Sequence, residues 1–400
     1  MPKVSKRADK TIASPIRKFL PLALEAEKKG VHIYKLNVGD PDIPVPADFW
    51  KGLRSYKFKG VGYAPSPGIR EHTQAWIQYY STFGVKLEVE NLLPTIGCAE
   101  AIMLSLLVMC DPGDELIVFE PLYSSYKSFA TMAGIKLVPV TLKVEDNFEL
   151  PSESFIRDRI TKKTKGIVLV NPNNPTGTVL TDKEIRMVVR IVKSKNLFLL
   201  SDETYREIVF GVKPRSVFQY PEARKFGIVV DSVSKKFSGP GLRIGSIASF
   251  NKNIMWAILK FAMARLSAPT LEQHALIPLL KHPRKYTGPI TAEYKRRKNV
   301  VYSALKKIPG VVCREPQGAF YIMAKLPLEN AEDFVRFMLV KFRHNNKTVM
   351  VTPAEDFYIT KGKGRSEIRI AYVLNTTDLN DAMKVFGAGL EAYTRMKSRK

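Results

Sequence analysis

The chain has 400 residues, of which 45% are hydrophobic and 10% aromatic, so it can form packed cores and is not intrinsically disordered. This length exceeds the size at which one hydrophobic core stops growing, which predicts two domains. The 63 Lys and Arg against 38 Asp and Glu give a net charge of +25, but the cations are spread along the chain, which argues against a nucleic-acid partner.

The charge has two remaining interpretations: a field that attracts anionic small molecules, or adaptation to an unusual cytoplasm. The basic residues 1–10 precede no apolar run, so no secretory signal is expected. The most apolar stretch, residues 101–110, is about half the length that spans a bilayer. The three cysteines form no CxxC pair, which argues against a disulfide framework and a zinc site. We therefore expect a cytoplasmic protein with no membrane partner and no metal.

Apolar strands alternate with helices through the first part of the chain. Continuous apolar strands of this kind predict an α/β fold, with a mostly parallel sheet covered by helices on both faces. The expected helices are residues 12–30, 99–109, 124–133 and 182–194. The expected strands are residues 33–38, 115–119, 136–140, 166–170, 197–201, 227–231 and 244–249.

The pattern changes to an α+β layout after a long helical stretch at residues 252–281. His282-Pro283 and Gly288-Pro289 follow this stretch, and we interpret them as a hinge. Further helices are expected at 294–307, 332–342 and 378–393, and strands at 311–313, 319–324 and 367–371. The expected units are an N-terminal arm that joins the small domain (1–45), a large domain (46–287) and a small domain (288–400).

Three short segments place reactive groups directly after apolar strands. They read NPNNPTG (171–177), SDETY (201–205) and SVSKKFSGPGLRIG (232–245). Ligands of open α/β sheets bind outside the carboxyl ends of the strands, so we expect the three segments to form one site.

Lys235 and Arg243 lie in the third segment. A lysine between a buried strand and a Gly-Pro-Gly loop can be desolvated, which lowers its pKa and frees the amine for Schiff-base formation. Arg243 can bind a phosphate through two parallel hydrogen bonds. Taken singly, a lysine at such a position is more often a surface residue in a loop, and the alternative for Arg243 is a structural salt bridge.

Asp202 ends the expected strand at residues 197–201. A buried carboxylate needs a cationic or proton-donating partner, and a protonated pyridine nitrogen is one. A helix-capping aspartate is the alternative. Asn174 and Tyr205 can both hydrogen-bond a phenolate oxygen on the same ring. Together the segments suit a pyridine-type cofactor that bears a phosphate and an aldehyde.

The same segments resemble those of the class I and II aminotransferases, fold type I enzymes that depend on pyridoxal 5'-phosphate. The pattern S-x-S-K-x-F-x-x-x-G-x-R-x-G carries the resemblance, which extends over residues 36–372. It implies a mostly parallel, seven-stranded type of sheet in the large domain and a smaller α+β domain. It also selects Lys235 over its neighbour Lys236 as the Schiff-base lysine, because Lys235 follows Ser-x-Ser directly.

The resemblance implies further roles residue by residue. Lys235, Asp202 and Tyr205 would be catalytic. Cys98 stands where the family often has Gly or Ser, which keeps the backbone contacts but changes the side chain. The implied cofactor contacts are Gly97, Cys98, Ala99, Tyr123, Asn174, Asp202, Tyr205, Ser232, Lys235, Arg243 and, across the interface of a homodimer, Tyr63. The implied substrate contacts are Gly39, Asn174 and Arg369, the last gripping the α-carboxylate.

The implied reaction is a ping-pong transamination between an amino acid and a 2-oxo acid. Aspartate is the favoured donor because SPIRKFLPLALEAEKKG, LNVGDPD and ARLSAPT resemble prokaryotic aspartate aminotransferases. A dicarboxylic substrate needs a second cation beyond Arg369, and Arg265 and several lysines are candidates. Aromatic amino acids, alanine and diaminopimelate are alternative substrates, and a carbon–sulfur lyase is an alternative enzyme. Because about 35 residues precede LNVGDPD, we expect no DNA-binding module.

Overall fold

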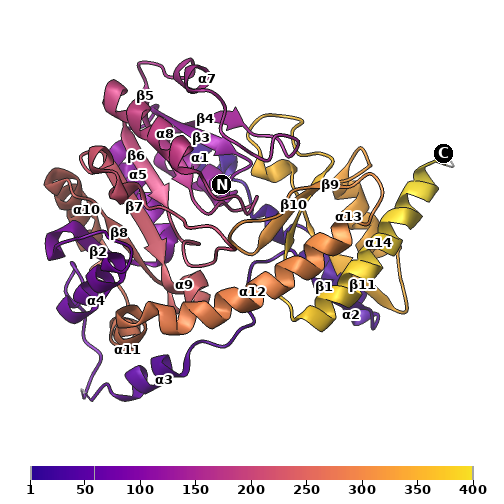
Figure 1. Cartoon of the computed structure of the whole chain (residues 1–400), viewed down its shortest axis with the longest axis horizontal. Helices are drawn as coiled ribbons and strands as arrows, with labels where there is room; N and C mark the ends of the chain where they lie inside the picture. Colours follow the sequence, from indigo (N-terminus) through magenta and orange to yellow (C-terminus); the bar gives the residue numbers. More distant parts are fainter. Residues whose placement is uncertain (1, 58, 399–400) are drawn as a thin grey trace.

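A computed structural model describes residues 2–57 and 59–398, which fold around two main sheets (Figure 1). Met1 and residues 399–400, which belong to the two expected outer units, lie outside the described residues. The larger sheet and its helices occupy one side of the molecule, and the smaller sheet occupies the other (Figure 1).

The larger sheet has seven strands, and six of these seven are parallel to one another. The exception among them is β8, which runs antiparallel to both of its neighbours. The order is β2 (Leu92–Ile96), β8 (Ile244–Ala248), β7 (Gly227–Ser232), β6 (Phe198–Asp202), β5 (Thr164–Val170), β3 (Glu115–Glu120) and β4 (Lys136–Thr141). The expected mostly parallel sheet is therefore confirmed.

Both faces of this sheet are apolar because alternate residues of each strand point to opposite sides. In β3, Leu116 and Val118 pack into one core, and Ile117 and Phe119 pack into the other. The first core is completed by α5 (Gly97–Met109), α6 (Ser125–Ala133) and α10 (Lys252–Ala264). The second is completed by α4 (Arg70–Ser81), α8 (Asp182–Lys195) and α11 (Thr270–Lys281).

The smaller half has its own core around an antiparallel sheet and a separate parallel pair of strands. The sheet order is β12 (Thr352–Pro353), β13 (Glu367–Ala371), β10 (Tyr321–Lys325) and β9 (Val312–Cys313). The pair is β1 (His32–Lys35) with β11 (Lys347–Met350), so an N-terminal strand joins a C-terminal one. The helices are α2 (Leu20–Lys28), α13 (Ala331–Val340) and α14 (Thr376–Ser398).

Helix α12 (Pro283–Leu305) runs without a break through Gly288 and Pro289, where the sequence suggested a hinge. It extends from beneath the large sheet to the small one (Figure 1). A proline inside a helix removes a backbone hydrogen bond, but Ile290, Tyr294, Val301 and Leu305 form a buried stripe that holds the helix. The expected boundary at 287/288 therefore falls inside one continuous helix.

Other elements differ from the expectation for local reasons. The expected helix at 252–281 is two helices, α10 and α11, because Pro269 is extended between them. Residues 12–30 contain a 3₁₀ turn (Pro15–Arg17) before α2 rather than one helix. The remaining helices of four residues or more are α1 (Lys6–Lys10), α3 (Ala47–Arg54), α7 (Glu153–Arg157) and α9 (Val233–Lys236).

A buried ion pair fixes α9 against the end of β7. Lys236 and Asp231 pair with side chains that are 0% and 1% exposed. The Lys236 amine also donates to the Tyr79 hydroxyl at 2.8 Å, and that hydroxyl donates to Glu207 at 2.8 Å. The two opposite charges neutralise each other inside the core, so removing one would leave the other buried without a partner.

Replacing Asp231 with Ala should lower the free energy of unfolding by about 3–5 kcal/mol, because the Lys236 charge would stay buried without a partner. Urea denaturation monitored by circular dichroism measures this change. The matched control is Glu145→Ala, which breaks an exposed pair with Lys325 and should cost less than about 1 kcal/mol. Equal losses in the two variants would contradict the assignment.

Candidate active site

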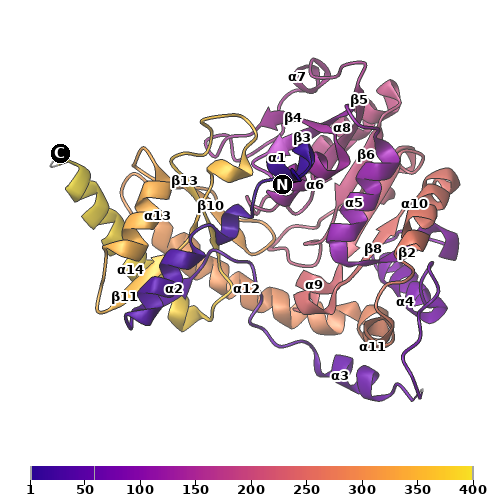
Figure 2. The same cartoon turned by 180° about the vertical axis from the view of Figure 1, so that it is seen from behind.

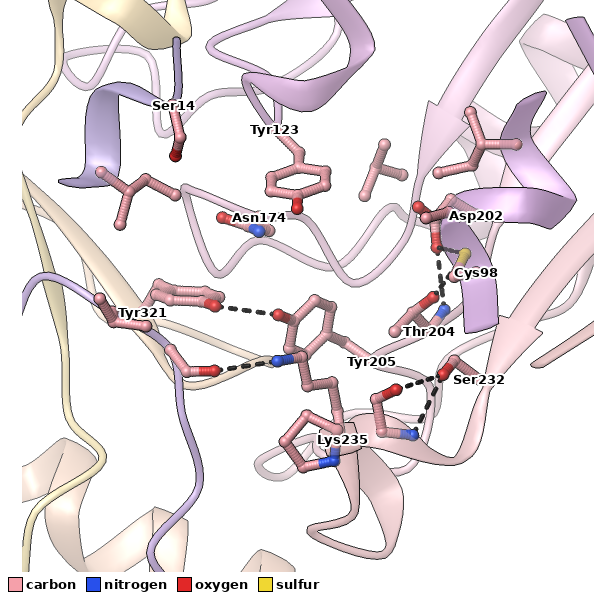
Figure 3. Close-up of a pocket in the computed structure, with 18 of the residues that line it drawn as sticks. Ser14, Cys98, Tyr123, Asn174, Asp202, Thr204, Tyr205, Ser232, Lys235 and Tyr321 are labelled. Carbon is pink, nitrogen blue, oxygen red and sulfur yellow. Dashed lines mark hydrogen bonds between the residues drawn. The ribbon is translucent and has the colours of Figure 1, made fainter. Parts of the chain in front are cut away.

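A cavity of about 300 Å³ lies at the carboxyl ends of the parallel strands, where the large half faces β10 and β13 (Figure 3). Val170, Asp202 and Ser232, the last residues of three strands, line it together with residues of the small sheet. The three segments singled out from the sequence therefore do meet. The expected site residues that line the cavity are Gly39, Cys98, Ala99, Tyr123, Asn174, Asp202, Tyr205, Ser232, Lys235, Arg243 and Arg369.

Lys235 extends from α9 into this cavity, whereas its neighbour Lys236 forms an ion pair with Asp231 in the core. The Lys235 amine donates a hydrogen bond to the carbonyl oxygen of Gly39 at 2.9 Å, and no carboxylate pairs with it in the described chain. Burial lowers the pKa of Lys235 to about 8; Asp40 acts in the opposite direction, and Arg369 and Arg243 lower it further. A lysine of this kind is an amine nucleophile near neutral pH.

Asp202 ends β6 with its carboxylate toward the cavity and receives hydrogen bonds from three neutral groups. The Thr204 backbone N–H donates to Oδ1 at 3.1 Å and the Tyr126 hydroxyl donates to Oδ2 at 3.2 Å. The Cys98 thiol lies 3.8 Å from Oδ1. Burial raises the pKa of Asp202, although these donors act in the opposite direction. No cation pairs with this carboxylate among the described residues, so a ligand cation can do so.

The N-terminal end of α5 and the loop before β8 form one corner of the cavity. Gly97 has a φ of +69°, and a Cβ atom there would lie 2.6 Å from Nη2 of Arg243. At Gly245 a Cβ atom would lie 2.7 Å from the carbonyl carbon of Gly97. The Ser232 and Ser234 hydroxyl oxygens are 2.7 Å apart in the cavity wall. Free N–H groups, hydroxyls and a guanidinium make this corner suited to a phosphate.

Arg369 on β13 is 1% exposed, yet it has no acidic partner among the described residues. Its Nη1 donates to Oδ1 of Asn174 at 2.9 Å and its Nη2 donates to the carbonyl oxygen of Asn37 at 2.7 Å. Its Nε is buried with no hydrogen-bond acceptor. The Tyr321 ring lies 4.3 Å from the guanidinium carbon. A buried cation with an unused donor is suited to an anionic ligand.

Two tyrosine hydroxyls meet within the cavity wall. The hydroxyl oxygens of Tyr205 and Tyr321 are 3.0 Å apart. A dashed line marks this hydrogen bond in Figure 3. Burial raises the pKa of Tyr205 well above its ordinary value of 10, so its hydroxyl stays protonated. Tyr123 and Asn174 lie on the opposite side of the cavity from Lys235 (Figure 3). The space between them is bounded by an aromatic ring on one side and an amine on the other.

Three residues considered from the sequence do not line the cavity. One is Gly97, although the next two residues, Cys98 and Ala99, do line it. Tyr63 is 83% exposed on the surface. Arg265 pairs with Glu100 at 3.0 Å and donates to the carbonyl oxygen of Pro94 at 2.9 Å. These two partners hold the Arg265 guanidinium away from the cavity wall, although its buried Nη1 has no hydrogen-bond acceptor.

The structure adds residues that the sequence analysis did not single out. They come from the N-terminal segment, from β10 and from two of the strand-end segments, where Thr204 lies within SDETY. Ser234 had a signal in the S-x-S-K pattern, but the N-terminal residues lie far from that motif. The additional polar or charged residues are Ser14, Arg17, Thr204, Ser234 and Tyr321.

Two absences complete the description of residues 2–57 and 59–398. They contain no group of three or more His, Cys, Asp or Glu side chains arranged to hold a metal ion. In the same part of the chain, no helix combines the length and apolar character needed to cross a membrane.

Comparison with known proteins places this geometry in a family. Residues 31–386 match the sequence model of the family described as Aminotransferase class I and II. The aspartate aminotransferase of Sulfurisphaera tokodaii is 31% identical over 375 residues, which is 92% of each chain. These matches cover nearly the whole of this chain.

Solved structures agree with the sequence matches. Thermus thermophilus aspartate aminotransferase with maleate superposes with a TM-score of 0.89 at 26% identity, covering 97% of this chain and 100% of that one. Alanine aminotransferase from Pyrococcus furiosus superposes with a TM-score of 0.89 at 28% identity, covering 98% and 100%. The fold type I architecture expected from the resemblance is confirmed. The chain belongs to the class I and II aminotransferases, a family of enzymes that depend on pyridoxal 5'-phosphate.

Proposed function

We propose that this aminotransferase binds pyridoxal 5'-phosphate in the cavity and moves the amino group of L-aspartate to a 2-oxo acid such as 2-oxoglutarate. One observation carries the proposal. Asp202 and Arg369 are buried and Lys235 is half-buried around the same cavity, and none has an oppositely charged partner among the described residues. Charges left unpaired in this way are stabilised when a ligand supplies their partners.

The residues fit the cofactor group by group. Arg243, Ser232 and the start of α5 at Gly97 would hold the phosphate, in a corner too tight for a Cβ atom. Asp202 would pair with a protonated ring nitrogen, and Lys235 would hold the aldehyde carbon. Asn174 and Tyr205 would bind the ring oxygen. Tyr123 would cover one ring face, with Cys98 and Ala99 at the edge of the site.

The bound cofactor would supply an electron sink for breaking bonds at the substrate Cα atom. Arg369 binds the substrate α-carboxylate and so fixes the position of Cα above Lys235. The neutral amine of Lys235 takes the proton from Cα and returns it in the opposite half-reaction. Asp202 would supply the negative charge that pairs with the ring nitrogen. The Gly39 loop lies against the Lys235 amine, where it can exclude water.

We also propose a cytoplasmic homodimer in which Tyr63 reaches the partner's phosphate site. Tyr63 is 83% exposed, its near neighbour in sequence Val61 is 62% exposed, and Trp50 of α3 is 49% exposed. Covering apolar surface of this kind with a second copy of the chain would stabilise a dimer. Within each subunit we propose a large domain (46–287) and a small domain (288–400), and α12 crosses the boundary between them. The N-terminal arm (1–45) would form part of the small domain.

Aspartate is the proposed donor because relatives that match over nearly the full chain carry that name. Alanine stays an alternative, since one solved relative is an alanine aminotransferase. Aromatic amino acids, diaminopimelate and a carbon–sulfur lyase reaction have no specific observation in their favour. A panel of amino donors with 2-oxoglutarate tests the proposal, and the absence of keto-acid-dependent amino transfer would contradict it.

Borohydride reduction of the holoenzyme should fix the cofactor on Lys235 and leave Lys236 unmodified, because Lys236 is held in the core by Asp231. Tandem mass spectrometry of the peptide that contains both lysines measures this. Lys235→Ala should lose turnover and the absorbance band of the bound cofactor together. Cofactor mass on Lys236 would refute the assignment.

The lowered pKa predicts how Lys235 reacts with pH. In the cofactor-free protein, the neutral fraction of this amine rises as the pH passes about 8, whereas an ordinary lysine needs a pH near 10.5. Labelling by an amine-selective reagent, followed by peptide mass spectrometry, should therefore reach half its maximal rate near pH 8 at Lys235. The exposed Lys252 is the internal control, and coincident profiles at the two lysines would disprove the shift.

Replacing Arg369 with Lys should lower kcat/KM for every amino donor by about 30- to 1000-fold. The variant keeps the charge but loses the planar fork that binds a carboxylate with two hydrogen bonds. Every amino acid has an α-carboxylate, so aspartate and alanine should suffer alike in single-turnover half-reactions. A loss confined to aspartate would assign Arg369 to the side chain instead.

A further inference from the structure

A third arginine, Arg17, lines the cavity beside Arg369 and Arg243. It ends the 3₁₀ turn Pro15–Arg17, in the segment between α1 and α2. Helix α1 lies against α6 of the large half, through Arg7 and the carbonyl oxygen of Met132, whereas α2 packs on the small half (Figure 2). The segment that carries Arg17 therefore passes from one half to the other at the edge of the cavity.

The backbone beside Arg17 is fixed to the same residue that holds Arg369. The Asn37 side-chain amide donates to the carbonyl oxygen of Ile16 at 2.8 Å. The Asn37 carbonyl oxygen accepts from Nη2 of Arg369 at 2.7 Å. One residue thus ties both arginines into neighbouring parts of the cavity wall. Buried Pro15 and Phe19 anchor the segment on either side of Arg17.

The guanidinium of Arg17 has no hydrogen-bond or ion-pair partner within residues 2–57 and 59–398, and the residue is exposed at the cavity edge. The next cation along the chain behaves differently. Lys18 pairs with Glu332 of α13 at 2.6 Å and does not line the cavity. Of two adjacent cations, one is held by the protein, and the other is left facing the site.

Without Arg17, the cavity wall would have no free cation for the second carboxylate of a dicarboxylic substrate. In the proposed function, Arg243 serves the cofactor phosphate and Arg369 serves the α-carboxylate. Asp202 is the one acidic residue in the described cavity wall, and it serves the ring nitrogen. Arg265, considered from the sequence as the second cation, is already paired with Glu100. Arg17 is therefore the cation available for a second carboxylate.

We propose that Arg17 binds the side-chain carboxylate of a dicarboxylic substrate and selects such substrates over uncharged ones. The inference rests on the proposed function, and it adds the residue that recognises the side-chain carboxylate of the substrate. The guanidinium can reorient at the exposed edge and offer two N–H groups to one carboxylate. A substrate without that carboxylate would gain nothing from Arg17.

The test compares Arg17→Gln with Lys18→Gln in the holoenzyme. Arg17→Gln should lower kcat/KM for aspartate and glutamate by about 10- to 100-fold, the effect of one hydrogen-bonded charge. The loss for alanine should stay within about threefold, because no carboxylate faces Arg17 in that complex. Lys18→Gln, which removes the adjacent cation, should leave all donors unchanged. Arg17→Lys should recover part of the aspartate rate.

An equilibrium measurement provides a second readout. Calorimetric titration with maleate, an unreactive dicarboxylate, should show weaker binding to Arg17→Gln by the same factor and unchanged binding to Lys18→Gln. Unchanged maleate binding and equal losses for aspartate and alanine would each overturn the role of Arg17. If the wild-type holoenzyme transfers no amino group from any donor, the proposed function itself fails. If it transfers amino groups without preferring dicarboxylic donors, only the Arg17 proposal fails.

Discussion

Burying a lysine amine without a carboxylate costs free energy, and the site depends on this unpaired burial. Lys235 and Lys236 are adjacent in sequence, but Lys236 is buried in the core whereas Lys235 is half-buried at the cavity. Lys236 turns into the core toward Asp231 and Tyr79, while Lys235 turns into the cavity, where a carbonyl oxygen is its acceptor. The first pair stabilises α9. That stability holds the second lysine in a position that lowers its pKa.

The same principle operates at the two other charged groups. Asp202 is surrounded by neutral donors, and Arg369 by neutral acceptors and aromatic rings. Each arrangement keeps the charge in place without neutralising it. Asp202 can therefore pair with a cationic ring nitrogen of a bound cofactor, and Arg369 can pair with the carboxylate of a bound substrate. An ion pair within the protein would remove that capacity.

Several elements could be predicted because their signal is local. The strand β13 (Glu367–Ala371) and the limits of α8 follow from apolar period and a capping box at Thr181. The strand β2 was missed because its short sequence, LLPTI, contains a proline. Proline is accepted there because β2 is an edge strand that pairs with β8 alone in the described sheet. The continuity of α12 was missed because Gly288-Pro289 reads locally as a break. Its buried stripe against the small core, a long-range interaction, prevents that break.

The sequence by itself determined the chemistry at the strand ends. Asn174, Asp202, Tyr205, Lys235 and Arg243 lie within about 70 residues. The first four end or closely follow parallel strands, and Arg243 precedes β8, which is antiparallel and so begins at the same edge of the sheet. Parallel strands bring their carboxyl ends together, so these residues had to converge. Only the tertiary structure decided which cations remain free. Arg265 pairs with Glu100, Lys18 pairs with Glu332, and Arg17 has no partner in the described chain. The Arg265–Glu100 and Lys18–Glu332 contacts join residues that are 165 and 314 positions apart, which no local pattern encodes.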